Sequence, residues 1–159
     1  MLQDPAETKM PDPASHGYMN QPGADDLAQM GITAEPGQDV SDWTVSWGQA
    51  GRGMYAVIED LGRWAATGLG NTLLPQSLGD QRLVTQPIPE GAYGLGVFDW
   101  GNGWIGHTGQ LIGWESIVAY NKDTGAIFVA IDNETASLGQ TFGVMQQFFP
   151  DLYKGLTGQ

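Results

Sequence analysis

The apolar positions along this chain change period near its middle. Over residues 54–68 they recur at steps of three and four, which gives one apolar face and predicts a helix that ends at Gly68. That face consists of Met54, Val57, Ile58, Leu61, Trp64 and Ala65. A second, shorter helix is predicted from Pro75, a residue favoured in a first helical turn, toward Leu83. Pro87 and Pro89 are expected to end it.

From Tyr93 onward, short apolar runs separated by turns predict an antiparallel sheet of about four strands. The expected strands are 93–98, 104–107, 114–120 and 126–131, with a turn over 99–103. Residues 121–125 are typical of a type I turn closed by a glycine in a left-handed conformation. The run 126–131 is apolar on both faces, so we expect it to be covered on both sides.

The two ends of the chain differ in regularity. Residues 136–149 carry apolar side chains at helical spacing, which predicts a closing helix that packs on the sheet and ends near Pro150. Residues 1–53 contain five prolines and little apolar periodicity, so we expect an irregular segment there. The predicted fold class is therefore α+β. Its first region, 1–53, is irregular, and its second region, 54–159, holds two helices, the sheet and the closing helix.

Composition and charge narrow the classes of function. The 159 residues are 41% hydrophobic and include 24 glycines, which fits one folded domain with many turns. Six basic against 18 acidic residues give a net charge of −12, which argues against nucleic acid and anionic membranes as partners. With no cysteine there is no disulfide and no thiolate metal site. No apolar run is long enough to span a membrane, and no signal peptide is recognised at the N-terminus.

Candidate chemistry is concentrated in residues 104–110, Trp-Ile-Gly-His-Thr-Gly-Gln. One of the two histidines stands there at the end of an apolar run, between glycines that let a ligand come close. A tight turn with a surface histidine is the alternative interpretation. None of the six serines has a lysine three residues on, and His16 and His107 share no helical face with a carboxylate. The residues alone thus give neither a complete catalytic set nor a metal site.

Several short motifs nevertheless follow one another in an order and spacing that resemble a known family. They are Ala50-Gly51-Arg52-Gly53-Met54, Glu59-Asp60-Leu61-Gly62-Arg63-Trp64, Tyr93-Gly94-Leu95-Gly96, Gly106-His107-Thr108-Gly109 and Gly113-Trp114. The chain resembles the beta-lactamase-related serine hydrolases, which include D-alanyl-D-alanine carboxypeptidases, class C beta-lactamases and esterases. It is most similar to the branch with His-Thr-Gly in place of Lys-Thr-Gly. The resemblance runs from about Met10 to Phe149 and implies part of a beta-lactamase/transpeptidase-like fold.

In that family a Ser-x-x-Lys helix supplies the nucleophile, a Tyr-x-Asn loop follows, and the Lys/His-Thr-Gly strand is the third element. Only the third is well matched, by residues 107–109. The resemblance implies that His107 donates to a substrate carboxylate or tunes the base, and that Thr108 hydrogen-bonds the substrate. It also implies that the backbone N–H of Gln110 is one oxyanion-hole donor.

The resemblance implies further contacts around the triplet. Gly109 and Gly113 would leave room for substrate, and Trp114 would border it. For Thr108 and Gly113, a purely structural role is the favoured alternative. Tyr18-Met19-Asn20 spells Tyr-x-Asn. It is the weaker candidate for the second element, because residues 15–18 resemble a later loop of the family.

The function implied by the resemblance is that of the C-terminal portion of a serine-type hydrolase that works through an acyl-enzyme. It needs no cofactor, acts on a small-molecule or peptide acyl substrate, and has its nucleophile in a missing N-terminal half. The resemblance also implies an extracytoplasmic location. Two alternatives remain: a non-catalytic module whose six tryptophans bind cell-wall sugars or peptides, and a degenerate homologue that binds a partner. Because the fold would lack strands and a helix, we expect the isolated chain to be marginally stable or oligomeric.

Overall fold

The computed structural model describes residues 10, 12–43, 54–89, 91–135, 146–147, 150 and 153–154. Its helices are α1 (Gln21–Gln29), α2 (Ile58–Trp64), the π-helical turn η2 (Ala65–Leu69) and α3 (Gln76–Arg82). Its strands are β1 (Tyr18–Met19), β2 (Gln86–Ile88), β3 (Gly91–Tyr93), β4 (Phe98–Gly101), β5 (Trp104–Leu111), β6 (Trp114–Asn121), β7 (Ile127–Asp132) and β8 (Glu134–Thr135). Among the helices of these ranges, none has both the length and the apolar content needed to cross a membrane.

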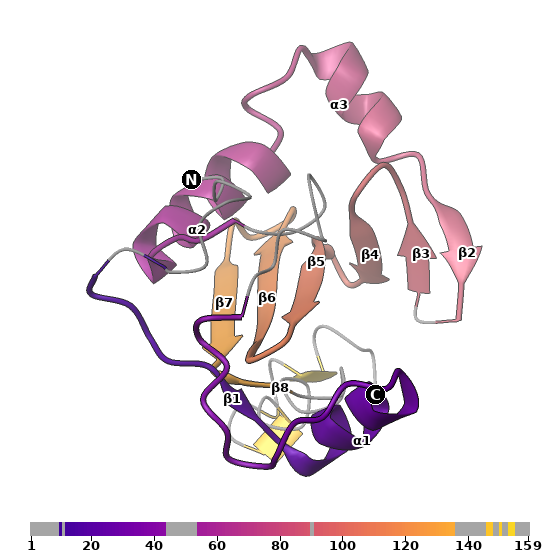
Figure 1. Cartoon of the computed structure of the whole chain (residues 1–159). Coiled ribbons are helices and arrows are strands. Elements are labelled where there is room, and N and C mark those ends of the chain that lie inside the picture. The colour runs from indigo at the N-terminus through magenta and orange to yellow at the C-terminus, as the bar shows by residue number, and fades with distance from the viewer. Residues whose placement is uncertain are drawn as a thin grey trace. The chain divides into compact units, whose positions relative to one another are not determined.

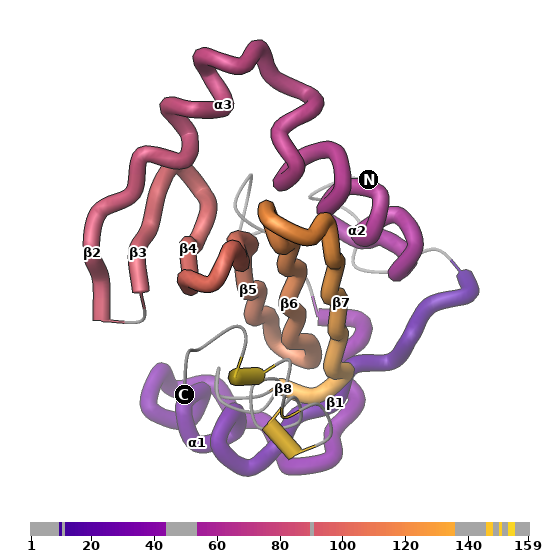
Figure 2. The backbone as a smooth tube through the Cα atoms, turned by 180° about the vertical axis from the view of Figure 1, so that it is seen from behind, coloured from indigo at the N-terminus to yellow at the C-terminus, as the bar shows by residue number. Residues whose placement is uncertain are grey.

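Strands β2 to β7 form one six-stranded sheet in the order of the sequence, and β1 pairs with β8 as a separate parallel ribbon. Figures 1 and 2 show the six strands side by side from opposite directions. The chain divides into two compact units. Unit 1 comprises Met1–Ala56, Gly109–Ser116 and Ile131–Thr141, and unit 2 comprises Val57–Thr108, Ile117–Ala130 and Phe142–Gln159. The predicted division at residue 53 stays a prediction.

Unit 1 contains regular structure where an irregular segment was expected. Helix α1 begins because the Asn20 side chain accepts a hydrogen bond from the Gly23 N–H at 2.8 Å. Pro22, interpreted from the sequence as a helix breaker, stands in the first turn, where its missing N–H removes no helical hydrogen bond. The expectation of irregularity over 1–53 is therefore wrong for residues 18–29. The buried core of unit 1 consists of Met19, Ala24, Leu27 and Val40.

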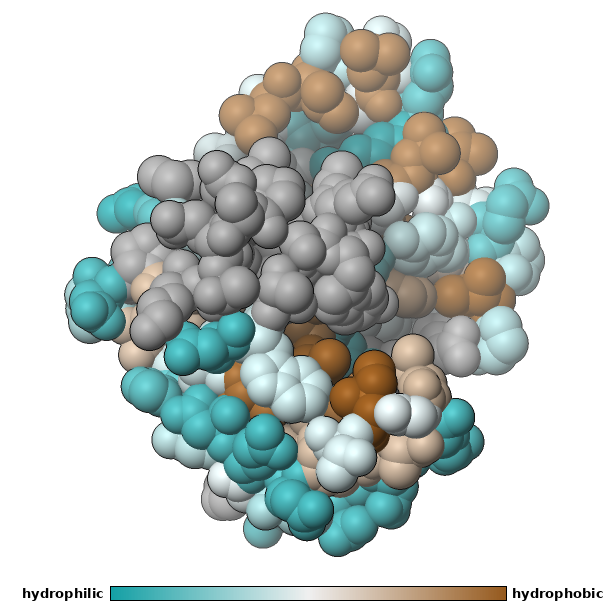
Figure 3. All heavy atoms as spheres, viewed as in Figure 1, coloured by the Kyte–Doolittle hydropathy of each residue, from teal (hydrophilic) through white to brown (hydrophobic). Residues whose placement is uncertain are grey.

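Unit 2 is built around two buried clusters. One consists of Ala65, Leu69, Val97, Ile105 and Val118, and the other of Trp104, Ile117 and Ala119. The predicted first helix is present, but α2 starts only at Ile58. The π-helical turn η2 follows it directly and is capped at Gly70, whereas the helix was expected to end at Gly68. Its apolar face is buried at Ala65 but exposed at Val57 and Ile58. Large apolar side chains are also exposed around α3, where brown spheres gather in Figure 3.

Among the described residues the sheet has six strands rather than about four, because one predicted strand is divided between β3 and β4 and because β2 was not predicted. The predicted strand 93–98 is wrong, because the chain turns between β3 and β4, where Gly94 N–H donates to the Val97 carbonyl and Gly96 has φ of +69°. The predicted turn at 99–103 begins only at Asn102, since β4 extends to Gly101. Pro87 lies inside β2, the first strand in the sheet order. An edge strand tolerates a residue that cannot donate a hydrogen bond.

The second helix and the last two strands of the sheet are confirmed as α3, β6 and β7. The turn that joins these strands is also confirmed, because Gly125 has φ of +72° and donates to the Asn121 carbonyl at 2.8 Å. The expectation that both faces of β7 are covered is wrong, since Ile127 and Ile131 are exposed. Among the strands that the structure describes, β7 is the last in the sheet order, so its apolar run does not mark a central strand there.

The predicted closing helix lies mostly outside the described residues, because 136–145 and 148–149 are not among them. The described residues that follow are helical, namely Gln146, Gln147, Pro150, Tyr153 and Lys154. Helical residues thus continue beyond Pro150, where the helix was expected to end. Tyr153 packs against the cluster that contains Trp104. The motif 50–53 also lies outside the described residues.

Candidate functional site

Strand β5 carries the histidine of the predicted site, and local packing fixes how that strand lies in unit 2. Trp104 and Ile105 are buried and hold the first half of the strand in the two cores. Gly106 follows at a point where neighbouring groups come very close. A Cβ there would lie 2.1 Å from the Val118 carbonyl oxygen and 2.9 Å from the Trp100 ring. The glycine therefore permits close packing of the sheet one residue before His107.

Both ring nitrogens of His107 are engaged within unit 2. The Nε2 atom lies 2.8 Å from the Tyr93 hydroxyl, and Nδ1 bonds to the backbone carbonyl of Thr108. A carbonyl oxygen only accepts, so Nδ1 carries the hydrogen of that bond. In a neutral imidazole Nε2 then has a lone pair, and the Tyr93 hydroxyl is its donor. The geometry thus defines one tautomer of the neutral ring.

Aromatic rings surround this pair and form what we call the ring cluster: Tyr93, Phe98, Trp100 and His107. The Phe98 ring meets Tyr93 edge-on at 4.6 Å between centroids and stacks on Trp100 at 5.6 Å with an interplanar angle of 8°. The centroid of His107 lies 5.1 Å from that of Phe98. All four side chains are half-buried. Sequence reasoning missed Tyr93 and Phe98, because it placed both in one strand instead of on paired strands.

The next residues of the predicted site belong to unit 1. Gly109 faces Ser116, whose Oγ lies 2.7 Å from where a Cβ would stand, and Gln110 is half-buried. Gly113 has φ of +88°, and its N–H donates to Thr135 Oγ1 at 2.5 Å. The space beside its Cα is filled by Val40 and Gly17 of the chain itself. These contacts explain Gly113 structurally, and its substrate role stays a prediction.

Three further predicted residues also make internal contacts in unit 1. Trp114 lies against Gly17, and its indole Nε1 is 3.4 Å from Ser15 Oγ. Tyr18 is 39% exposed and pairs through its backbone with β8. Asn20 is buried, and its Oδ1 is occupied as the cap of α1. The Tyr-x-Asn role of these two residues stays a prediction.

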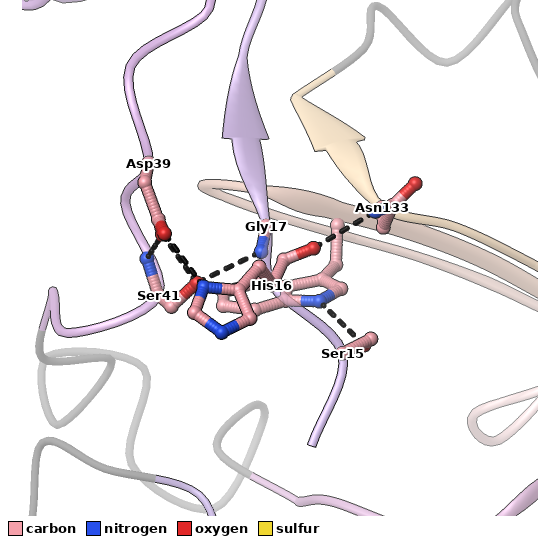
Figure 4. A network of polar contacts seen from close by, with 7 residues as sticks. Ser15, His16, Gly17, Asp39, Ser41 and Asn133 are labelled. Atoms are coloured by element: carbon pink, nitrogen blue, oxygen red, sulfur yellow. Dashed lines mark hydrogen bonds and ion pairs between the residues drawn. The ribbon is translucent and has the colours of Figure 1, made fainter.

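A second polar network in unit 1 joins residues that sequence reasoning left apart (Figure 4). Asp39 accepts a hydrogen bond from the Ser41 hydroxyl at 2.5 Å and lies 2.6 Å from His16 Nδ1. The Ser41 oxygen also accepts from the Gly17 N–H at 3.0 Å. The hydrogen bonds from Ser41, aided by His16, hold the pKa of Asp39 at about 2, below its usual 3.8. The carboxylate is therefore ionised at neutral pH.

A metal site needs several ligating side chains close together. In the described part of the chain, no three histidine, aspartate or glutamate side chains lie close enough together to hold a metal ion. The described site offers an oriented imidazole and hydroxyl groups, which can position and polarise a substrate.

Comparison with known proteins places this arrangement in context. The sequence model of the family described as beta-lactamase matches residues 2–140. A D-stereospecific amidohydrolase from Streptomyces sp. has a similar structure, with a TM-score of 0.70 and 23% sequence identity. The match covers 92% of this chain and 42% of the amidohydrolase chain. The structure of SurE is also similar, with a TM-score of 0.60 and 22% sequence identity. That match covers 94% of this chain and 35% of the SurE chain. This chain thus spans less than half the length of either protein. No curated protein sequence matches it.

Proposed function

We propose, because this chain belongs to the beta-lactamase family, that it supplies one wall of the active site of a serine-type hydrolase. The observation that carries the proposal is the His107-Thr108-Gly109 triplet on β5, with its imidazole held in one orientation by Tyr93. None of the six serines of the chain has a lysine three residues on. The nucleophile and its base are therefore proposed to come from an N-terminal half outside these 159 residues.

The proposed reaction is acyl transfer through an acyl-enzyme. The external serine attacks the substrate carbonyl, the leaving group departs, and water then releases the acyl group from the serine. The backbone N–H of Gln110 is one proposed donor to the oxyanion that forms on the carbonyl oxygen. Thr108 is the proposed side-chain contact to the substrate, while Gly109 leaves room for it.

The proposed substrate is a small molecule or peptide with an amide or ester bond. The similar Streptomyces protein is named as an amidohydrolase, which favours an amide for that protein. A peptide, a beta-lactam or an ester each present the same reacting carbonyl. An extracytoplasmic location is proposed as well, because it is the usual one for this family.

The first test uses the polypeptide as its native host makes it. We expect an intact mass above 17.0 kDa and covalent labelling by a fluorophosphonate probe, with the label on a serine outside these 159 residues. The isolated chain should not be labelled. A native mass of 17.0 kDa, or a label on a serine of this chain, would contradict the proposal.

A substitution then tests the role of the triplet. His107→Ala in the native polypeptide should lower kcat/KM for a chromogenic amide substrate by about 10²-fold, the scale at which positioned catalytic groups act. The control is His16→Ala, whose side chain lies in unit 1 and bonds to Asp39. Equal effects of the two substitutions would count against the proposed wall.

The stacked, half-buried pair Phe98 and Trp100 favours one alternative, a non-catalytic module that binds ligands on aromatic rings. That alternative predicts saturable binding of cell-wall sugars or peptides by the isolated chain. It also predicts that no form of the protein is labelled by the serine-directed probe. The labelling experiment therefore separates the two functions.

A further inference from the structure

The hydrogen bonds of His107 carry one inference about how the proposed wall works. We propose that Tyr93 is the positioning residue of His107, and that it keeps the imidazole from acting as a hydrogen-bond donor to the substrate. This inference rests on the proposed function for its catalytic meaning. Its structural part concerns only residues of unit 2.

The two hydrogen bonds of His107 have defined directions. The Thr108 carbonyl accepts from Nδ1, which leaves Nε2 of the neutral ring as an acceptor. The Tyr93 hydroxyl lies 2.8 Å from Nε2. Among the four side chains of the ring cluster, it is the only hydroxyl. The neutral imidazole then has no N–H left to give.

The Tyr93 hydroxyl is held in place by the packing of its ring. A hydroxyl fixes its acceptor only when its own ring is fixed, and the Tyr93 ring meets Phe98 edge-on at 4.6 Å. Phe98 in turn stacks on Trp100, and Tyr93 and Phe98 are direct partners in the register of β3 and β4. The position of the hydroxyl is thus set by the sheet and not by a mobile loop.

These hydrogen bonds determine which donor the triplet offers to a substrate. In its neutral form, His107 donates to the Thr108 carbonyl and accepts from the Tyr93 hydroxyl. The side-chain donor that the triplet offers to a substrate is then the Thr108 hydroxyl. This differs from the role implied by resemblance, in which His107 itself donates to a substrate carboxylate.

The test is nuclear magnetic resonance of the imidazole nitrogens in the full 159-residue chain. His16→Gln leaves His107 as the one histidine, because the chain has two. The tautomer is read from spectra in which one ring nitrogen carries a hydrogen and the other does not, as only a neutral ring shows. We expect a protonated Nδ1 and an unprotonated, hydrogen-bonded Nε2. An Nε2–H tautomer would overturn the inference without the need for any further variant.

Tyr93→Phe then removes one hydroxyl and keeps the ring that contacts Phe98. We expect the Nε2 resonance to move to the position of a nitrogen without a hydrogen bond and the ring to sample the second tautomer. Tyr120→Phe is the matched control, because Tyr120 is another half-buried tyrosine of the same sheet. Unchanged nitrogen resonances in Tyr93→Phe would overturn the inference.

A kinetic measurement separates this inference from the proposed function. In the native polypeptide, Tyr93→Phe should lower kcat/KM about 10-fold and Tyr120→Phe should not, by analogy with residues that orient metal-bound histidines. If the nitrogen resonances behave as expected but no serine is labelled, only the proposed function fails. If hydrolysis occurs and Tyr93→Phe leaves kcat/KM unchanged, the positioning role fails.

Discussion

Replacing Gly106 by alanine adds one methyl group at the most crowded point of the strand that carries His107. The new Cβ would lie 2.1 Å from the Val118 carbonyl oxygen and 2.9 Å from the Cα of Ala119. Cβ atoms in real proteins essentially never come within 3.0 Å of such atoms. Both are backbone atoms of β6, so no side-chain rotation relieves the overlap. Strand β5 has to move away from β6.

The size of the effect follows from that movement. Overpacking in a well-packed interior costs about 1–3 kcal/mol, and each weakened ladder hydrogen bond adds about 0.5–1.5 kcal/mol. We therefore expect Gly106→Ala to lower the free energy of unfolding by about 2–4 kcal/mol. At about 2–4 °C per kcal/mol for a chain of this size, Tm should fall by roughly 5–15 °C.

The matched control is the same substitution at Gly62, in the interior of α2. A Cβ there meets nothing within 4 Å, so the change only improves helix propensity. Gly62→Ala should raise the free energy of unfolding by about 0.5–1 kcal/mol. Urea titrations followed by tryptophan fluorescence measure both variants, since both sites belong to unit 2. A Gly106→Ala variant as stable as the wild type would refute the close approach of β5 and β6.

Three further predictions concern other parts of the chain. In the folded state the pKa of Asp39 is lowered to about 2, so the ionised carboxylate stabilises the fold. This stabilisation is present above about pH 4 and is lost as the pH falls toward 2. Asp39→Asn should therefore flatten acid unfolding over this range, as followed by circular dichroism. Asn20→Ala removes the cap of α1 and should cost about 1 kcal/mol in a urea titration, whereas Asn20→Ser should retain most of the stability. The exposed apolar side chains over α3 (Figure 3) lead us to expect that the isolated chain associates with itself. Its mass in sedimentation should therefore rise above 17.0 kDa as the protein concentration increases. A single concentration-independent monomer would contradict that expectation.

The sequence predicted the elements whose periodicity is strong and uninterrupted. Helices α2 and α3 and strands β6 and β7 lie within a few residues of their expected positions. The errors arose where one residue type has two structural uses. Pro22 begins a helix instead of preventing one, and Pro87 lies in an edge strand. Tyr93 and Phe98 belong to two strands because the glycines between them form a turn, which alternation of apolar residues does not reveal.

The candidate site shows the same division. The His-Thr-Gly triplet is visible in the sequence because its members are consecutive, and resemblance to a family gives it meaning. The partner of His107 is not visible, because Tyr93 reaches it only through the order of β3, β4 and β5 in the sheet. For Asn20, a motif match predicts contact with a substrate, which stays a prediction, and the structure shows that its buried side chain caps α1.

The network of Ser41, Asp39 and His16 shows why residue identity alone does not locate a nucleophile. These are the three residue types of a serine-hydrolase triad, but a triad requires the histidine between the serine and the carboxylate. Here Asp39 stands in the middle, so the hydroxyl of Ser41 is bound by an ionised carboxylate instead of by a base that takes its proton to a reacting group. The Ser41 oxygen also accepts the Gly17 N–H, which ties two segments of unit 1 together. The network therefore acts as a structural clamp and offers no alternative to the external serine that the proposed function requires.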